Sequence, residues 1–292
     1  MKNTSSVIGK LNKKVEMVFL DDYCDKHNSK KVRKMVYEGE HFCPMCFTEK
    51  LNKELQIKVT RDVIKDKINR KYNYLKEKSL VADVELFSST IENYFLYCEE
   101  TARNRNKVID LIKRINRGEN VSVWFSGNTG VGKSHLAMAM LKNLNDFSMK
   151  QAKRDLKEKP FVEVLDNMKT CLFVNTNMLM DSIRESFNDK TVITTPKFMI
   201  DRLINVDYLV LDDIGSEVGS IDTNKSASDF VTRVIYAIVT GRQNKTTIYT
   251  TNLSSKMLRS IYDEKAYSRM SKNAETIVYK TAKDQRGGYL GF

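Results

Sequence analysis

The sequence lacks any apolar stretch long enough to span a membrane, and its opening residues, MKNTSSVIGKLNKKVEM, lack the apolar core of a secretory signal. These absences exclude a membrane-spanning or classically secreted protein, so we expect a cytoplasmic one. The chain also has no internal repeat, no low-complexity tract and only three prolines among its 292 residues. Domain boundaries must therefore be read from changes in residue pattern, and the length favours one large domain with a small one.

Cysteine and charge are unevenly distributed. The five cysteines are an odd number and three of them lie close together, which in a reducing compartment indicates metal binding before disulfides. The net charge is +12, and residues 1–82 hold 19 Lys or Arg against 11 Asp or Glu, a net of +8. Such an excess favours anionic partners such as nucleic acid, although a solvated basic surface explains it equally well.

The clustered cysteines form part of a pattern typical of a structural zinc site. Two short pairs, C-x-x-H and C-x-x-C, are separated by fifteen residues and suit tetrahedral zinc with three thiolates and one imidazole. His41 is a rival fourth ligand, but its closeness to the second pair makes it less suitable sterically. A segment this short, with few large apolar residues, needs a cross-link such as a bound metal ion in order to fold. We therefore predict a zinc-binding module over residues 1–47. Its candidate ligands are Cys24, His27, Cys43 and Cys46.

Two helices are expected next. Apolar residues at spacings of three to five predict a basic amphipathic helix over residues 48–78, in a connector region, 48–82, that could also contact a partner. Ser89 and Glu92 have the spacing of a capping box, which predicts a second helix running to about Arg117. The apolar residues of the first helix are Leu51, Leu55, Val59, Val63, Ile68, Tyr72 and Leu75.

The remainder of the chain alternates short apolar runs with segments of helical length. This alternation predicts an α/β fold with a mainly parallel sheet and helices on both faces, with ligands bound at the carboxyl ends of the strands. The expected strands are residues 121–126, 171–175, 208–213, 246–251 and 276–280.

The segment GNTGVGKS follows the first of these strands and precedes the helical pattern SHLAMAMLKNL. It fits the phosphate-loop pattern G-x-x-x-x-G-K-[ST] at every fixed position. The glycines let backbone N–H groups face a β-phosphate, Lys133 would reach the β- and γ-phosphate oxygens, and Ser134 would bind Mg²⁺. The predicted nucleotide-binding residues are Gly127, Asn128, Thr129, Gly130, Val131, Gly132, Lys133 and Ser134.

Two further strands end in polar residues suited to ATP hydrolysis. The run YLVLDD ends in Asp212, which would hold Mg²⁺, and Asp213, which would polarise the attacking water. The run TTIYTT is followed by Asn252, whose amide could orient that water, although an Asn after a strand is most often a turn residue.

Together the segments WFSGNTGVGKSHLAMAM, YLVLDDIGSE, FVTRVIYAIVTGRQNKTTIYTTNLS and AYSRM resemble the AAA+ ATPases of the DnaC/DnaI-type bacterial and phage helicase loaders. The resemblance covers about residues 83–292, taken as the AAA+ ATPase domain. It implies a five-stranded sheet in the order 5-1-4-3-2, an ATP site shared between subunits, and a homo-oligomeric ring or spiral such as a hexamer. Residues 146–168 stand out as an insertion without an assigned role.

The resemblance also implies roles for single residues. On this mapping Asn252 is sensor 1, Arg269 is the arginine finger that reaches the γ-phosphate of a neighbouring subunit, and Arg286 is the sensor 2 arginine in cis. Ala282 and Lys265 depart from the family pattern, which has a glycine and an arginine at these places. The Cys/His segment resembles the small zinc modules that precede the ATPase in several phage and Gram-positive loaders.

The function implied is an ATP-dependent loader that binds a replicative DNA helicase and delivers it onto single-stranded DNA, with ATP hydrolysis as the switch. The alternative is a transposition helper ATPase of the IstB type, which shares the ATPase motifs but carries a different N-terminal extension. A zinc-bearing adaptor with negligible turnover is a third possibility, and the complete set of ATPase motifs disfavours it.

Overall fold

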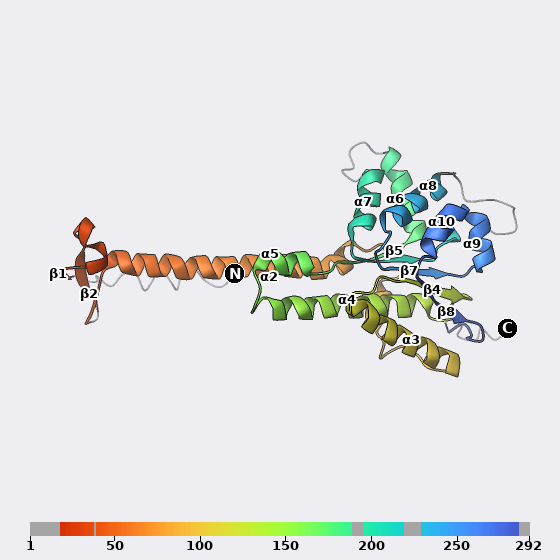
Figure 1. Cartoon of the computed structure of the whole chain (residues 1–292), viewed down its shortest axis with the longest axis horizontal. Helices are drawn as coiled ribbons and strands as arrows, with labels where there is room; N and C mark the ends of the chain where they lie inside the picture. The colour runs from red at the N-terminus through yellow and green to blue at the C-terminus, as the bar shows by residue number, and fades with distance from the viewer. Residues whose placement is uncertain (1–17, 38, 189–194, 219–228, 286–292) are drawn as a thin grey trace. The chain divides into compact units, whose positions relative to one another are not determined.

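The computed structural model describes residues 18–37, 39–188, 195–218 and 229–285 (Figure 1). The chain divides into two compact units, Met1–Asp66 and Lys67–Phe292, and the division falls inside one long helix. The three domain ranges read from the sequence remain predictions. Among the described residues, no helix combines the length and the apolar character that a membrane crossing requires.

Unit 1, Met1–Asp66, contains a small antiparallel sheet in the order β1-β2-β3. A 3-10 turn connects its first two strands, and a long helix, α2, begins two residues after the third. The elements are β1 (Val18–Tyr23), η1 (Asp25–Lys30), β2 (Arg33–Tyr37), β3 (Glu40–Phe42) and α2 (Pro44–Lys78).

The helix predicted over residues 48–78 is present as α2, but the prediction that it is amphipathic is wrong. Leu51, Leu55, Val59 and Val63 are all between 45% and 60% exposed, and the buried apolar side chains of α2 lie near its C-terminal end. At 100° per residue the four exposed side chains fall within about 120° of the helix circumference, whereas Ile68, Tyr72 and Leu75 fall on a different side, so the apolar residues form no single stripe along α2.

Unit 2, Lys67–Phe292, is built on a five-stranded sheet in the order β5-β6-β7-β4-β8, with every neighbouring pair parallel (Figure 1). Numbered within the sheet and read from β8, this is the predicted order 5-1-4-3-2. The strands are β4 (Ser122–Gly127), β5 (Cys171–Asn175), β6 (Tyr208–Asp212), β7 (Thr247–Thr251) and β8 (Ala274–Tyr279). The predicted α/β fold with a parallel sheet is confirmed.

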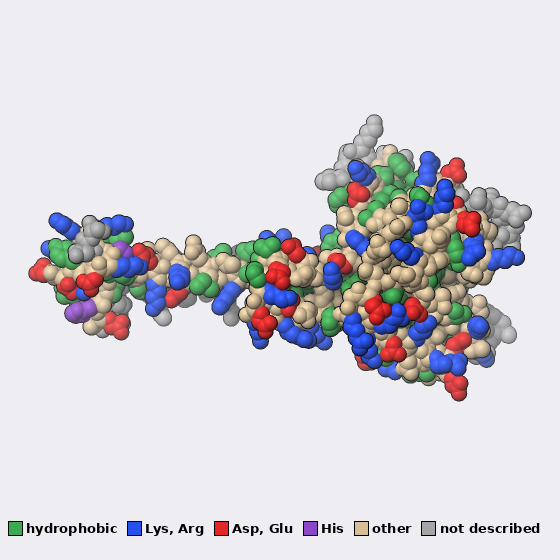
Figure 2. Space-filling model, viewed as in Figure 1, with side chains coloured by type: hydrophobic (Ala, Val, Ile, Leu, Met, Phe, Trp, Pro, Cys, Tyr) green, Lys and Arg blue, Asp and Glu red, His purple; other side chains and the backbone are tan. Residues whose placement is uncertain are grey.

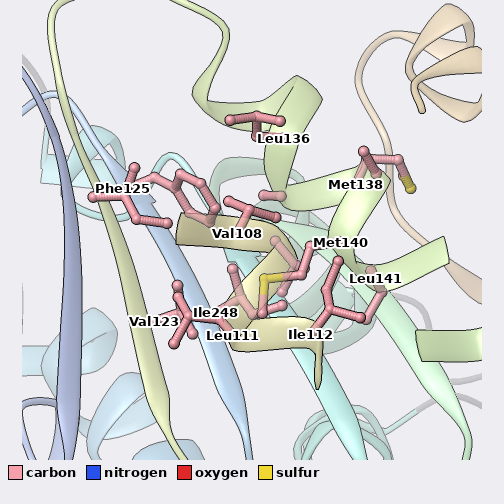
Figure 3. Close-up of a cluster of buried hydrophobic side chains, with 14 of the residues drawn as sticks. Val108, Leu111, Ile112, Val123, Phe125, Leu136, Met138, Met140, Leu141 and Ile248 are labelled. Atoms are coloured by element: carbon pink, nitrogen blue, oxygen red, sulfur yellow. The ribbon is translucent and has the colours of Figure 1, made fainter. Parts of the chain in front are cut away.

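Helices cover both faces of this sheet because side chains alternate along each strand. Val123 and Phe125 of β4 pack with α3 and α4 in the cluster that Figure 3 shows, whereas Trp124 packs in a second cluster with the remaining helices. The helices are α3 (Glu99–Asn116), α4 (Lys133–Asp155), α5 (Phe161–Asn167), α6 (Thr176–Asn188), α7 (Pro196–Asn205), α8 (Asp229–Gly241), α9 (Ser255–Ile261) and α10 (Glu264–Met270), with 3-10 turns η2 (Val84–Ser88) and η3 (Ser216–Val218).

The capping box predicted at Ser89 is wrong, since α3 begins at Glu99. The preceding residues form a non-helical segment whose Ile91 and Tyr94 are buried in the core beside the phosphate loop. Lys142 of α4 donates to the carbonyl of Ser89 at 2.9 Å, which fixes this segment across α4. Tertiary burial of two large side chains thus outweighs a local capping pattern.

The insertion at residues 146–168 forms the end of α4 and all of α5, and it holds the last turns of α2 within unit 2. The Tyr72 hydroxyl donates to Asp146 Oδ1 at 2.7 Å, and Lys71 Nζ donates to the carbonyl of Met168 at 3.2 Å. The insertion therefore anchors the end of α2 to the rest of unit 2.

Candidate nucleotide site and candidate metal centre

The phosphate loop lies between β4 and α4, as its pattern requires. Gly130 and Gly132 have φ of 77° and 92°, in the left-handed region that favours glycine. A Cβ on Gly130 would lie 1.6 Å from Asp284 Oδ1, and one on Gly132 would lie 2.7 Å from the Tyr94 ring. Larger residues are excluded at both positions, and α4 begins directly after Gly132, so its first N–H groups face the loop.

Lys133 connects the loop to the end of β7. Its Nζ donates to the carbonyls of Gly127 at 2.9 Å and Asn128 at 2.6 Å, and to Asn252 Oδ1 at 2.7 Å. Asn252 is therefore more than a turn residue, because it meets the phosphate-loop lysine.

The acidic residues at the end of β6 complete the arrangement. Ser134 Oγ and Thr250 Oγ1 each donate to Asp212 Oδ1 at 2.7 Å, and Asn252 Nδ2 donates to Asp213 Oδ1 at 3.0 Å. Burial raises the pKa of Asp212, an effect that the hydrogen bonds from Ser134 and Thr250 oppose. A cavity of about 720 Å³ lies between these residues and the loop, within the size range of small-ligand sites.

The backbone of Asp213 is held by residues that sequence reasoning missed. Its φ is 59°, an unusual value for a residue other than glycine, and its N–H donates to Thr250 Oγ1 at 2.8 Å. Thr176 Oγ1 lies 3.0 Å from the Asp213 carbonyl oxygen. Glu217 accepts from the N–H of Gly215 at 2.9 Å, and burial raises the pKa of its carboxyl group. These contacts fix the direction of the Asp213 carboxylate.

The structure describes one of the two arginines that the resemblance assigns to the ATP site, Arg269, but not the other. Arg269 lines a small cavity together with Ser122 and Thr247, which begin β4 and β7. Parallel strands start at one edge of a sheet and end at the other, so Arg269 lies at the edge opposite the nucleotide cavity. Its guanidinium lies over the Tyr236 ring at 4.7 Å. Arg286 lies outside the described residues.

In unit 1, the structure brings together the side chains of both short pairs. Their ligand atoms all lie within 4.8 Å of one another, and His41 is exposed on β3 outside the group. His27 Nδ1 is 3.5, 3.5 and 3.4 Å from the sulfurs of Cys24, Cys43 and Cys46. The sulfurs of Cys24 and Cys46 are 3.6 Å apart.

These separations fit a tetrahedral zinc ion. With Zn–S near 2.3 Å and Zn–N near 2.0 Å, a tetrahedron separates sulfur from nitrogen by about 3.5 Å and sulfur from sulfur by about 3.8 Å. Burial opposes ionisation of the Cys24 thiol, but hydrogen bonds from His27 outweigh it and lower the thiol pKa to about 6. The residues therefore fit zinc, which would cross-link η1 to the start of α2.

The fold and the phosphate-loop geometry together define an α/β P-loop nucleotide-binding domain, with the strand order that the resemblance to AAA+ ATPases implies. Within that class, the chain resembles replicative helicase loaders of the DnaC type. It is 27% identical over 131 residues to the replicative helicase loader DnaC of Escherichia coli strain K12, which is 45% of this chain and 44% of that protein. It is 28% identical over 148 residues to DnaC of Buchnera aphidicola subsp. Baizongia pistaciae, 50% of this chain and 48% of that protein.

A solved structure supports the same fold. A crystal structure of the DnaC helicase loader superposes with a TM-score of 0.51 and 24% identity, over 68% of this chain and 100% of the other. No protein-family model matches the chain. The chain spans about half the length of the curated relatives it matches. The predicted resemblance to helicase loaders is confirmed.

Proposed function

We propose that this protein is an ATP-dependent loader that binds a replicative DNA helicase and delivers it onto single-stranded DNA. The observation that carries the proposal is the connected set of contacts from Lys133 through Asn252 to Asp213, in a domain that resembles DnaC. The N-terminal unit, with its candidate metal centre, supplies the helicase contact.

Each residue of the cavity has its own proposed role in ATP binding or hydrolysis. On binding, Lys133 exchanges its carbonyl partners for β- and γ-phosphate oxygens, while loop N–H groups hold the β-phosphate. Ser134 and Asp212 would hold Mg²⁺, which would neutralise phosphate charge. Asp213 polarises the attacking water and Asn252 orients it.

Arg269 acts on the neighbouring subunit of a ring or spiral. Its position at the opposite edge of the sheet supports a role in trans, because it cannot reach the nucleotide cavity of its own chain. The Tyr236 ring keeps the guanidinium plane fixed, which suits a fork that bridges two phosphate oxygens. Arg286 remains the proposed sensor 2 arginine in cis.

The proposed contact with single-stranded DNA is mainly electrostatic. On the face shown in Figure 2, Lys and Arg side chains lie among Asp and Glu side chains. We infer that assembly brings basic residues of several subunits together along one strand. Binding should then weaken steeply with salt and depend little on sequence.

The first test uses the nucleotide site. Lys133→Ala should abolish ATP binding, because no other group replaces the ammonium at the β- and γ-phosphates, whereas Lys150→Ala, at an exposed position of the same helix, should bind normally. Arg269→Ala should bind ATP but lose turnover by roughly a thousandfold. Isothermal titration and steady-state phosphate release measure the two effects.

Subunit mixing separates action in trans from action in cis. The Arg269→Ala chain keeps an intact phosphate loop, and the Lys133→Ala chain keeps an intact arginine. Mixed oligomers should therefore recover part of the turnover that each variant lacks. Normal turnover by Arg269→Ala alone, or no recovery in the mixture, would contradict the assignment.

The second test concerns the partner. The full chain, purified with zinc, should capture the replicative helicase of the same cell or phage, and chelation of zinc should abolish the capture. Helicase loading is then measured as strand unwinding on a DNA substrate with a single-stranded gap, with Lys133→Ala as the control. Capture of a transposase without the helicase would instead support a transposition helper.

A further inference from the structure

Glu49 contacts the candidate metal centre without belonging to the ligand set. It lies in the second turn of α2, and its Oε1 is 2.8 Å from His27 Nε2. His27 itself is 6% exposed, and its other ring nitrogen, Nδ1, faces the three sulfurs. The second oxygen of Glu49 accepts from Lys26 Nζ. The imidazole is therefore placed between the sulfur cluster and a carboxylate.

This placement decides which tautomer of His27 is present. A neutral imidazole carries one N–H and one lone pair, and only the lone pair can bind a metal. A carboxylate at Nε2 accepts a hydrogen bond, so it favours the tautomer with the proton on Nε2. The lone pair then lies on Nδ1, the nitrogen that faces the sulfurs. The same hydrogen bond makes the ring a more basic ligand.

We propose that Glu49 is a positioning residue of the zinc centre, which holds His27 in the Nδ1-ligating tautomer and orientation, with Lys26 fixing the carboxylate. The proposal rests on the zinc centre proposed above. Because Glu49 belongs to α2 and His27 to η1, the hydrogen bond also joins the same two elements that the metal joins. Folding of the module and metal affinity are thereby coupled.

A simpler account would make Glu49 one half of a surface ion pair with Lys26. Both side chains are largely exposed, at 46% for Glu49 and 67% for Lys26, and such pairs contribute little. The two accounts differ in what happens to zinc. A surface pair would leave zinc affinity unchanged on removal of either partner, whereas a positioning role makes it depend on Glu49 much more than on Lys26.

The test measures zinc affinity of the full-length chain by competition with a chromophoric chelator. Glu49→Ala should weaken zinc binding by roughly 10-fold to 100-fold, the usual effect of losing such a partner. Glu49→Gln, which keeps an acceptor but loses the charge, should lie between Glu49→Ala and the wild type. Glu54→Ala, at an exposed position of the same helix, should match the wild type, and Lys26→Met should stay within a few-fold of it.

A spectroscopic measurement reads the tautomer directly. Two-bond ¹H–¹⁵N correlation spectra of the zinc-loaded wild type should show His27 bound through Nδ1 and protonated at Nε2. Ligation through Nε2, or a Glu49→Ala affinity within twofold of the wild type, would overturn the proposal. Failure of the wild type to bind zinc at all would overturn the metal centre instead, so the two failures are distinguishable.

Discussion

The two compact units are stabilised in different ways. Among the residues of unit 1 whose burial is described, only Cys24, His27, Met35 and Cys43 are buried, and three of these four are candidate metal ligands. Unit 2 instead packs apolar side chains against both faces of its sheet. The difference indicates that a metal ion replaces the apolar core in a segment too short to build one.

The two units also differ in how their buried polar groups are satisfied. In unit 2, the guanidinium of Arg242 is 3% exposed, and its N–H groups donate to the carbonyls of Leu203 and Val206 at 2.7 Å and of Thr246 at 2.7 Å. These bonds compensate for the loss of water, and they need no ligand. The polar groups of the unit 1 cluster, three cysteine sulfurs and a ring nitrogen, instead face one another, and the thiolates that bind zinc would be balanced by the charge of the metal ion.

The largest expected effect is the loss of zinc from unit 1. Structural zinc in small modules contributes about 10–16 kcal/mol of folding free energy, so chelation or Cys43→Ser should unfold β1–β3. Hydrogen exchange should then show unprotected amides in these strands, with unit 2 protected and still binding ATP. Cys98→Ser, outside the cluster, is the control and should retain zinc. Unchanged protection of β1–β3 after complete zinc removal would contradict the comparison.

A smaller effect is expected from a cavity in unit 2. Leu141 of α4 is fully buried in the same cluster as Ile112 of α3 (Figure 3), so Leu141→Ala should lower the free energy of unfolding of unit 2 by about 2–5 kcal/mol. Zinc affinity should not change. Truncation of Val162 to Ala in α5, a side chain of the same unit that is 68% exposed, should cost less than about 0.5 kcal/mol. Chemical denaturation monitored through Trp124 measures both, and equal costs would show that burial does not decide stability here.

The fold was predictable where one pattern dominates. Four of the five strands of the parallel sheet, β4 to β7, are mostly buried runs, whereas the edge strand β8 is partly exposed, and each strand was predicted to within about two residues. The helix predicted to run to about Arg117 is present as α3, but its predicted start at Ser89 is wrong because the burial of Tyr94 beside the phosphate loop is a long-range contact. A capping pattern is local and carries no information about such contacts.

The residues of the candidate sites were likewise predictable only where they belong to a motif with fixed spacing. The phosphate loop and the Cys/His pairs have fixed spacings, so their chemistry can be read from the sequence. Thr176, Glu217 and Glu49 belong to no such pattern, since threonine and glutamate are common throughout the chain. Their positions become meaningful only when the fold brings them to Asp213 and His27. The one signal in the sequence that could have indicated Glu217 is its place at the end of the segment LDDIGSE, which carries part of the resemblance to helicase loaders.

The smallest expected effect concerns a carboxylate that ties α3 to the end of β8 in unit 2. Glu100 accepts from the N–H groups of Lys280 at 2.8 Å, Thr281 at 3.0 Å and Ala282 at 2.8 Å. Burial opposes ionisation, but these bonds outweigh it and lower the carboxyl pKa below its ordinary value of 4.5. The stabilisation is therefore complete above that value and is lost as the pH falls through the lower, folded-state pKa.

Glu100→Gln should lower the stability of unit 2 by about 1 kcal/mol at neutral pH, because the amide is a weaker acceptor for the three N–H groups. It should also make the loss of stability in acid shallower, since one ionisable group no longer contributes. Denaturant titrations at a series of pH values between neutral and acid measure both effects, with the exposed neighbour Glu99→Gln as the control. Identical pH dependence in the two variants would mean that the carboxylate of Glu100 adds no more to this unit than a surface charge does.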